Sequence, residues 1–420
     1  MAIRAFFSVF ISILVAGCSS SNSDYCDNTT PCTGGKVCDL PTRSCLPRKD
    51  GAVSDARSAD QSLNDAGVAR DATLADAAPL CDPKTCGAYR CNANNSACRT
   101  DCISQDHCIA TSVCDRSEAH KTGAGVCIDP SKVFVLAAGG DLQKTIDALP
   151  AGKTHIKLAG SVYNHFILDQ NKMTKAVTVA VIGGGTQPTT IDTNAAGIFV
   201  NESNSSLYLQ DVKVSGATVG GGPGIRWGVA VQRGKLTMVD SSVEKNETGV
   251  LDFGSGLGLP SPRIELRRVR MLANHGYAVS LADGVLANVL VQGNGGCIVD
   301  KSCGDGSSVL SIGKNVSVSN LTVVGNTVGK VAVHCDPSTP ALQNVVAQNN
   351  VTKDGLTING NSDCSLSPQP PVCTLDSDGK NVKGSPCVDV GSGVSPGKID
   401  LLGNPRIKGA AIDLGAYELQ

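Results

Sequence analysis

The sequence predicts an all-β solenoid, in which short strands wind in successive coils around one core. Five segments align without gaps on a pattern of alternating apolar and polar residues closed by an asparagine: 236–246, 264–274, 284–294, 316–326 and 340–350. A repeat of roughly 20–35 residues that holds a strand and no helix indicates a solenoid. The composition agrees, since 47 glycines and only 3% aromatic residues suit thin β-layers with many turns.

The closing asparagines of the repeats predict a structural ladder at a corner of the coil. They are Asn246, Asn274, Asn294, Asn326 and Asn350. Asparagine tolerates the left-handed backbone conformation that a sharp corner between two sheets requires. Stacked side-chain amides can also hydrogen-bond one another. A sugar-binding strip is the alternative interpretation of this row.

The first 17 residues have the pattern of an export signal, with Arg4 followed by an apolar run over 5–15. This run is too short and too close to the N-terminus to be a spanning helix. It ends in Leu-Val-Ala-Gly-Cys at 14–18, which resembles the bacterial lipobox. The resemblance implies cleavage before Cys18 and acylation of that residue, so the chain would contact the membrane through its lipid. Ser19 and Ser20 resemble the sorting residues of outer-membrane lipoproteins, which predicts the outer membrane or cell surface.

Nineteen cysteines indicate an oxidising compartment. The segment 18–49 holds Cys26, Cys32, Cys38 and Cys45 with C-x5-C-x5-C-x6-C spacing, and the segment 81–130 holds Cys81, Cys86, Cys91, Cys98, Cys102, Cys108, Cys114 and Cys127. The last four have C-x5-C-x5-C-x12-C spacing, which predicts a duplicated disulfide module whose pairing stays open. The modules resemble the Dickkopf-N-terminal-like and EGF-like segments of myxobacterial surface lipoproteins.

No metal site is predicted in the cysteine modules, because C-x2-C pairs of the kind that bind zinc are absent from the sequence. Between the modules, 50–80 is rich in Ala and Asp and poor in large apolar residues. This composition predicts a flexible linker, with an isolated helix as the alternative. Linker and modules together would hold the solenoid away from the membrane. The six later cysteines would staple loops, with Cys297–Cys303 as the most local pair.

The third region, 133–420, begins with a predicted amphipathic helix over 142–149. Leu142, Ile146 and Leu149 share one face, Asp141 suits the N-cap, and Pro150 ends the helix. Strand patterns follow, with Gly-Gly-Gly at 183–185 and Thr-Thr-Ile-Asp at 189–192. This order resembles the start of pectate-lyase-like right-handed parallel β-helix proteins. The resemblance implies a right-handed coil whose open end is covered by the helix.

The C-terminal segment carries three further motifs: Ser-Pro-Cys-Val-Asp-Val-Gly at 385–391, Asp-Leu-Leu-Gly-Asn-Pro-Arg at 400–406 and Ala-Ile-Asp-Leu-Gly-Ala-Tyr-Glu at 411–418. They resemble the ending of β-helix proteins in the choice-of-anchor Q group. Sorting tails often follow this ending in that group. Here two residues follow Glu418, so the N-terminal lipid is expected to be the only anchor.

The sequence predicts the fold of this protein more firmly than it predicts the function. A net charge of −2 argues against nucleic acid as a partner. The β-helix resemblance implies cleavage of acidic polysaccharides, for which a lyase needs a cationic group and a base, often Arg or Lys. Glu265, Arg267 and Arg270 are the catalytic candidates. Strand alternation points Ile264 and Leu266 inward and leaves Glu265 and Arg267 on the outer face.

We therefore hold two hypotheses for the solenoid. The first is non-catalytic binding of polysaccharide or another cell-envelope component. The second is a polysaccharide lyase, supported if Arg267 and Arg270 line one groove beside carboxylates on adjacent coils. No cofactor is predicted, and only a lyase would add Ca²⁺. His165, His275 and His334 have no evident partner in the sequence, and the oligomeric state stays open.

Overall fold

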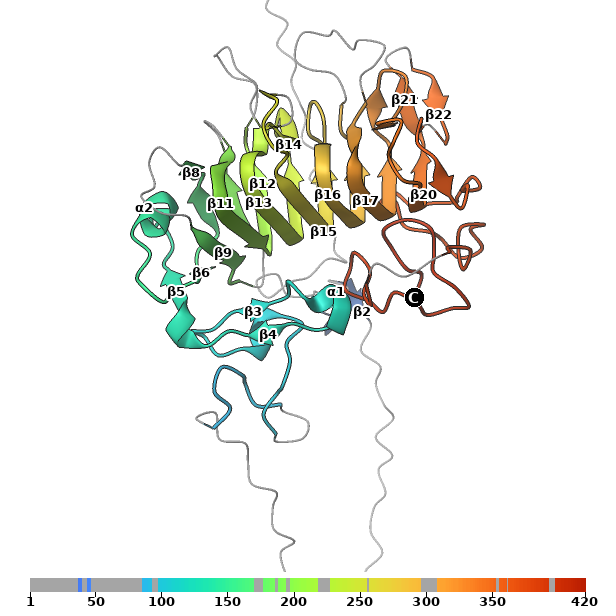
Figure 1. Ribbon diagram of the computed structural model, residues 1–420. Coiled ribbons are helices and arrows are strands. Elements are labelled where there is room, and N and C mark those ends of the chain that lie inside the picture. Colours follow the sequence, from blue (N-terminus) through green and yellow to red (C-terminus); the bar gives the residue numbers. More distant parts are fainter. Residues whose placement is uncertain are drawn as a thin grey trace, which may run out of the picture. The chain divides into compact units, whose positions relative to one another are not determined.

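The computed structural model describes residues 37–39, 44–46, 85–92, 97–169, 177–185, 188–193, 197–217, 227–254, 257–295, 308–352, 355–360, 362–392 and 397–420 (Figure 1). The chain divides into two compact units, Met1–Thr73 and Leu74–Gln420. In the part of the chain that is described, no helix is long and apolar enough to cross a membrane. The predicted export signal, Cys18, Cys26, Cys32, the 50–80 linker, Cys81 and the pair Cys297–Cys303 lie outside the described residues.

The first unit is described only as a two-stranded hairpin. Its strands β1 (Val37–Asp39) and β2 (Ser44–Leu46) are antiparallel, and Cys38 lies opposite Cys45. In the second unit, β3 (Cys114–Asp115) and β4 (Val126–Cys127) repeat this arrangement, with Cys114 opposite Cys127. Matched hairpins at matched cysteines support the duplication that the spacing predicts.

The second unit is dominated by a parallel β-solenoid with three faces, so the predicted fold class is confirmed. The short strands are β5 (Val133–Leu136), β6 (His155–Leu158), β7 (Val162–Asn164), β8 (Ile167–Asp169), β9 (Thr178–Gly183), β10 (Thr189–Asp192), β12 (Val212–Ser215), β14 (Thr248–Asp252), β18 (Thr327–Val328), β19 (Val333–Cys335), β20 (Leu342–Gln348), β21 (Asn350–Thr352), β22 (Thr357–Ile358) and β23 (Leu366–Ser367). The long strands, which bend around corners, are β11 (Ile198–Gln210), β13 (Trp227–Glu244), β15 (Arg263–Leu272), β16 (Val279–Gln292) and β17 (Leu310–Val324).

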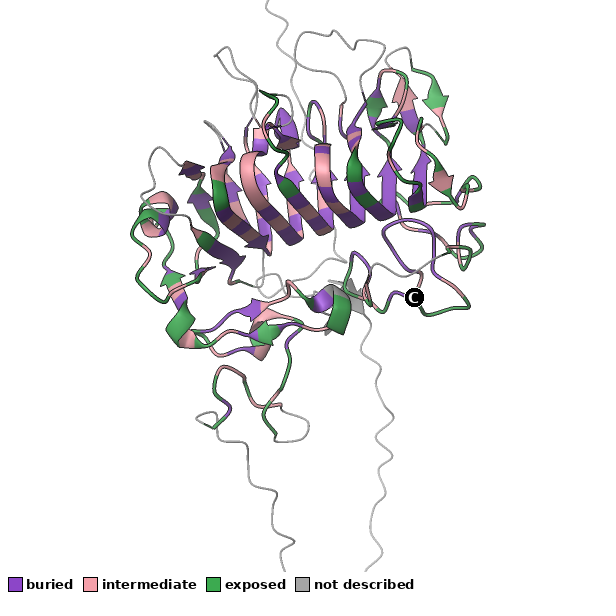
Figure 2. Ribbon diagram, viewed as in Figure 1, coloured by how far each residue is buried: buried purple, intermediate pink, exposed green. Residues whose placement is uncertain are grey.

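Each coil visits the three faces in turn. Face 1 runs from β5, β6 and β9 through residues 206–210, 235–239, 263–267, 284–287 and 316–319 of the long strands to β23. Face 2 runs from β7, β10 and β12 through the ends of β13, β15, β16 and β17 to β20. Face 3 runs from β8 through β11, β13, β14, β16 and β17 to β19. Inward side chains from all three faces form one aliphatic core. Figure 2 marks buried residues in bands along the strands of the solenoid.

The asparagine ladder lies at the corner between face 2 and face 3. Each side-chain amide donates to the next side-chain carbonyl, at 3.2, 2.9, 3.0 and 2.9 Å from Asn246 to Asn350. The prediction that these asparagines adopt the left-handed conformation is wrong. The residue before each one does so instead: Lys245, Ala273, Gly293, Gly325 and Asn349. The turn is therefore made one residue earlier, which frees the asparagine side chain to point along the solenoid axis.

A second corner, between face 1 and face 2, holds another column of left-handed residues. They are Asp211, Asp240, Arg268, Asn288, Asn320 and Asn344, with φ between 50° and 55°. The asparagine members stack through their amides at 3.1 and 3.0 Å. Charged residues occupy the same positions in the earlier coils.

Helix α2 (Leu142–Asp147) shields the N-terminal end of the solenoid core, and the C-terminal segment covers part of one face. The helix is capped by Asp141, whose carboxylate accepts from Lys144 N at 2.9 Å, and its Leu142 and Ile146 are buried in the core. It ends two residues before the predicted boundary. The C-terminal segment lies on the outer side of face 2. There Leu414 packs against Val346, and Ala416 N donates to Thr322 Oγ1 at 2.9 Å.

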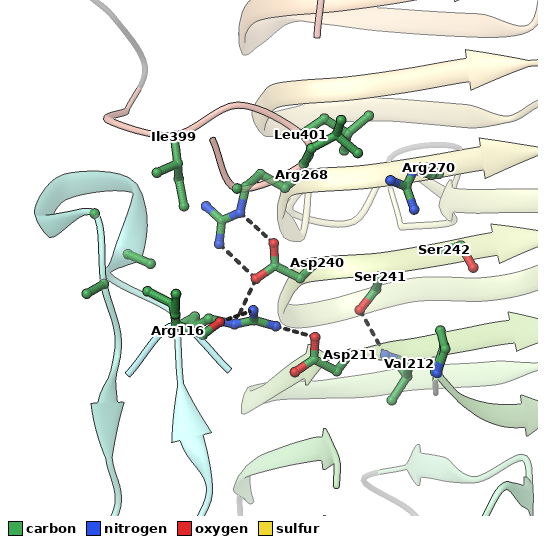
Figure 3. A pocket seen from close by; sticks show the side chains of 17 residues that line it. Arg116, Asp211, Val212, Asp240, Ser241, Ser242, Arg268, Arg270, Ile399 and Leu401 are labelled. Carbon is green, nitrogen blue, oxygen red and sulfur yellow. Dashed lines mark hydrogen bonds and ion pairs between the residues drawn. The ribbon is translucent and has the colours of Figure 1, made fainter. Parts of the chain in front are cut away.

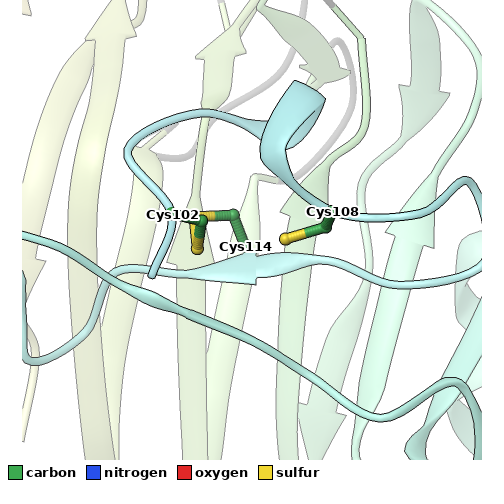
Figure 4. Close-up of side chains that lie close together, drawn as sticks. All are labelled: Cys102, Cys108 and Cys114. Atoms are coloured by element: carbon green, nitrogen blue, oxygen red, sulfur yellow. A yellow bond between two sulfur atoms is a disulfide. The ribbon is translucent and has the colours of Figure 1, made fainter. Parts of the chain in front are cut away.

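The second cysteine module also contains α1 (Ala119–Thr122) and the 3-10 turns η1 (Gln105–His107) and η2 (Pro130–Lys132). Its disulfides are Cys102–Cys114, Cys108–Cys127 and Cys86–Cys98, and Cys91 is disulfide-bonded as well. The Cys102–Cys114 bridge and the neighbouring Cys108 lie at the centre of the module (Figure 4).

This module is not a separate spacer. Its Val113 packs against Ala180 and Ile182 on the outer side of face 1. Gln210 and the backbone of Cys114 and Arg116 exchange hydrogen bonds at 2.7 Å. The second module therefore packs directly on the solenoid, because apolar outer positions of face 1 give it a surface. Its position relative to a membrane stays a prediction.

Candidate functional site

A chain of four charges joins the second cysteine module to the corner between face 1 and face 2 (Figure 3). Arg116 of the module forms an ion pair with Asp211, and its Nε lies 3.1 Å from Asp240 Oδ2. Asp240 also accepts two hydrogen bonds from Arg268, at 2.5 and 2.9 Å. One of these residues lies in the module and the other three lie on three successive coils, so only the fold brings them together.

Burial and charge act in opposite directions in this chain. Burial lowers the pKa of Arg116, but Asp240 and Asp211 outweigh it, so the pKa is raised overall. Burial raises the pKa of Asp211, and Arg116 offsets only part of this effect. Arg268 is 2% exposed. Both carboxylates are engaged in ion pairs, which gives them a structural role.

A cleft of about 340 Å³ lies beside this chain. Besides the charges, it is lined by Arg270 and Ser242 of face 2 and by the exposed side chains of Ile103 and Leu402. Arg270 contacts Tyr417 from the C-terminal segment, and burial raises the pKa of Tyr417 while Arg270 offsets part of that rise. The cleft is thus bounded by the module, the corner and the C-terminal segment.

The predicted catalytic residues divide between two faces. Glu265 and Arg267 point outward from face 1, where Lys235, Arg263 and Arg267 surround Glu265 at 3.2, 3.1 and 3.4 Å. Burial raises the pKa of Glu265, but its cationic neighbours outweigh burial and lower it overall. Arg270 follows the left-handed corner at Arg268 and so lies on face 2, in the cleft. Arg267 and Arg270 therefore do not line one groove.

Three aromatic rings gather on face 3, in a cluster that the sequence did not reveal. The ring centroids of Phe199, Trp227 and Phe253 lie 6.1 Å (Phe199–Trp227), 6.5 Å (Phe199–Phe253) and 5.5 Å (Trp227–Phe253) apart. All three side chains are partly exposed. Phe199 lies in β11, Trp227 is the first residue of β13 and Phe253 directly follows β14, and these three strands are neighbours on face 3. We call these three residues the aromatic platform.

One group of carboxylates has the spacing of a cation site. Oxygens of Asp389, Asp413 and Glu418 lie within 4.8 Å of one another. These oxygens already accept backbone N–H groups, including Leu419 N to Asp413 at 2.7 Å and Asp413 N to Glu418 at 3.2 Å. The buried Arg406 is a positive charge beside the group. The arrangement fits a set of contacts that stabilises the C-terminal segment better than it fits the Ca²⁺ site that a lyase would need.

The fold and these surfaces define the chain as a parallel β-solenoid with a docked disulfide module. The sequence matches no family model, and neither a curated protein nor a solved structure matches it.

Proposed function

We propose that this protein is a lipid-anchored cell-surface protein whose solenoid binds polysaccharide without cleaving it, through the aromatic platform. The observation that carries the proposal is the assembly of the single tryptophan of the chain with two of its seven phenylalanines on one outer face. Aromatic rings present rigid apolar faces at low entropic cost, and these faces suit the C–H surface of a pyranose ring.

Polar groups beside the platform support a sugar over an apolar partner. Asn201 and Asp169 are in register next to Phe199 and its neighbour Ile167. Among the described residues, Trp227 Nε1 and Asn201 Oδ1 have no hydrogen-bond partner, which leaves a donor and an acceptor for hydroxyl groups. Both atoms are shielded from solvent, so a sugar reaches them after a side-chain rotation.

Binding without cleavage of the polysaccharide chain is supported by the state of the charges in the cleft. Asp211 and Asp240 are held by Arg116 and Arg268, and Arg270 is separated from Glu265 and Arg267 by the corner. A polysaccharide lyase remains the second candidate, because Arg270 lies in a cleft that could admit a uronate. The corner nevertheless removes the paired arginines on which that candidate rested.

The anchoring part of the proposal rests on the lipobox-like residues 14–18 and on the resemblance to the choice-of-anchor Q group. It places the chain at the outer membrane or cell surface. Labelling with palmitate tests it, since Cys18→Ala should abolish both label and membrane association. A Cys18→Ala protein that is still labelled and membrane-bound would overturn the anchor.

The binding experiment uses the oxidised protein in affinity electrophoresis through a panel of neutral and acidic polysaccharides. Trp227→Ala should weaken retention about tenfold, which corresponds to ~1.4 kcal/mol. Arg267→Ala and Arg270→Ala are matched controls on the other faces and should leave retention unchanged. Release of unsaturated uronate products that disappears in Arg270→Ala would favour the lyase instead.

A further inference from the structure

An outward-facing row of residues crosses face 3 at its C-terminal end. Ser280 is in register with Ser311, and Ser311 is in register with His334. A bridge between Val333 and Ser362 continues the register, so Asp363 lies beside His334 on the next coil. His334 therefore has Ser311 on one side and Asp363 on the other.

The Asp363 carboxylate is oriented from two directions. Its Oδ2 lies 2.6 Å from His334 Nδ1, and its Oδ1 accepts from Cys335 N at 2.7 Å. The disulfide Cys335–Cys364 joins the residues that follow His334 and Asp363, with Cα atoms 5.2 Å apart. Histidine and aspartate are therefore held together by backbone register, by a hydrogen bond to the main chain and by a covalent link.

This arrangement directs the chemistry of the imidazole. A carboxylate at Nδ1 fixes the proton there, which leaves Nε2 as the basic nitrogen. Nε2 is the ring nitrogen that does not contact Asp363, and Ser311 is the register neighbour of His334 on the side opposite Asp363. Neighbouring strands are roughly 4.8 Å apart, so the two side chains stand next to each other on the same face. No hydrogen bond joins Ser311 to His334 in the structure, and in many catalytic sites such bonds tighten only when substrate binds.

We propose that Ser311, His334 and Asp363 form an ester-hydrolysing site, with O-acyl groups of a glycan as the substrate class. Ser311 is the nucleophile, His334 the general base and Asp363 the residue that positions the imidazole. The choice of a glycan rests on the proposed function, because the aromatic platform lies on the same face; the ester chemistry does not depend on it.

The reaction is a two-step acyl transfer. Ser311 Oγ bonds to the carbonyl carbon while His334 Nε2 takes the hydroxyl proton. The bond from that carbon to the sugar oxygen breaks, and the sugar oxygen receives this proton. Water then attacks the acyl-serine, Nε2 takes a proton from the water, and the bond to Ser311 breaks as Oγ recovers the proton. Ester and water give carboxylic acid and sugar hydroxyl.

The test uses the full oxidised protein with p-nitrophenyl acetate as substrate and a fluorophosphonate probe for the serine. Ser311→Ala and His334→Gln should each lower the hydrolysis rate about 100-fold. Mass spectrometry should place the probe on Ser311. Asp363→Asn should also lower the rate, and rescue by Asp363→Glu would identify positioning. Ser280→Ala removes the neighbouring hydroxyl of the same row and should change nothing. All four positions point outward, so circular dichroism should show unchanged folding.

Two results would overturn the esterase. One is a wild-type rate equal to the uncatalysed rate with no probe on Ser311. The other is loss of hydrolysis in His334→Gln with full activity in Ser311→Ala, which would mean that imidazole attacks the ester directly. Failure of glycan binding gives a different outcome: p-nitrophenyl acetate is hydrolysed, but Trp227→Ala does not slow acetate release from an acetylated polysaccharide.

Discussion

Arg268 and Asp240 form a two-bond ion pair between successive coils, and both residues have left-handed backbone conformation at the same corner. In later coils the same corner is occupied by Asn288, Asn320 and Asn344, whose amides stack. The charged pair and the amide stack thus have the same role, because each forms hydrogen bonds between corner side chains of successive coils. The charged version has the added ability to hold Arg116 of the cysteine module.

Removing the Arg268 guanidinium should destabilise the solenoid. Arg268→Met leaves Asp240 with Arg116 as its remaining partner, and loss of one member of a buried pair costs about 3 kcal/mol or more. Urea unfolding measures the loss. Arg263→Met, in which the replaced side chain is 57% exposed, should change stability by less than about 0.5 kcal/mol. The double variant Asp240→Asn with Arg268→Asn should recover part of the loss by extending the amide stack. No recovery would show that charge itself is required.

Replacing Arg116 should loosen the cysteine module from face 1. In Arg116→Ala, Asp211 and Asp240 lose a shared partner at the contact with the module. Hydrogen exchange should accelerate at residues 102–127, whose disulfides stay closed, while the core strands keep their protection. Lys121→Ala removes an exposed ion pair with Glu118 in the same module and serves as the control. Equal exchange in both variants would contradict this role of Arg116.

Interrupting the asparagine ladder should be costly in its middle. Asn326 accepts from both the backbone and the side chain of Asn294 and donates to Asn350. Asn326→Ala leaves several buried groups unpaired, at about 1–3 kcal/mol for each group. We expect a loss of roughly 3 kcal/mol or more in urea unfolding. Asn315→Ala makes the same chemical change at an exposed position of β17 and should be nearly neutral.

Stability should fall as pH rises from about 5 to about 8 because of Glu418. Burial raises the pKa of Glu418 to about 7, from the ordinary value of 4.5. Between these values the folded chain binds more protons than the unfolded chain, so rising pH favours unfolding. Glu418→Gln should flatten this part of the profile in thermal unfolding. A profile that is identical in the variant would mean that Glu418 is ionised in the folded protein throughout this range.

The sequence determined the solenoid because its signal is local and repeated. Alternation between apolar and polar residues fixes which side chains point inward. Because the same pattern recurs, the prediction of each strand supports the prediction of the others. The capping of α2 by Asp141 depends on residues close in sequence, so it too was predicted. The sequence also located Asn246 and its relatives at a corner, although it assigned the left-handed conformation to the wrong residue of each pair.

Only the tertiary structure determined which residues lie together on one surface. The corner at Arg268 turns Arg270 onto another face, although Arg270 is only three positions after Arg267 in the sequence. The spacing between coils varies with each inserted loop, so in-register neighbours such as Ser311, His334 and Asp363 are separated by unequal lengths of chain. Phe199, Trp227 and Phe253 meet for the same reason. The coils repeat more regularly in space than in sequence, because inserted loops project away from the core at the corners and do not shift the strands.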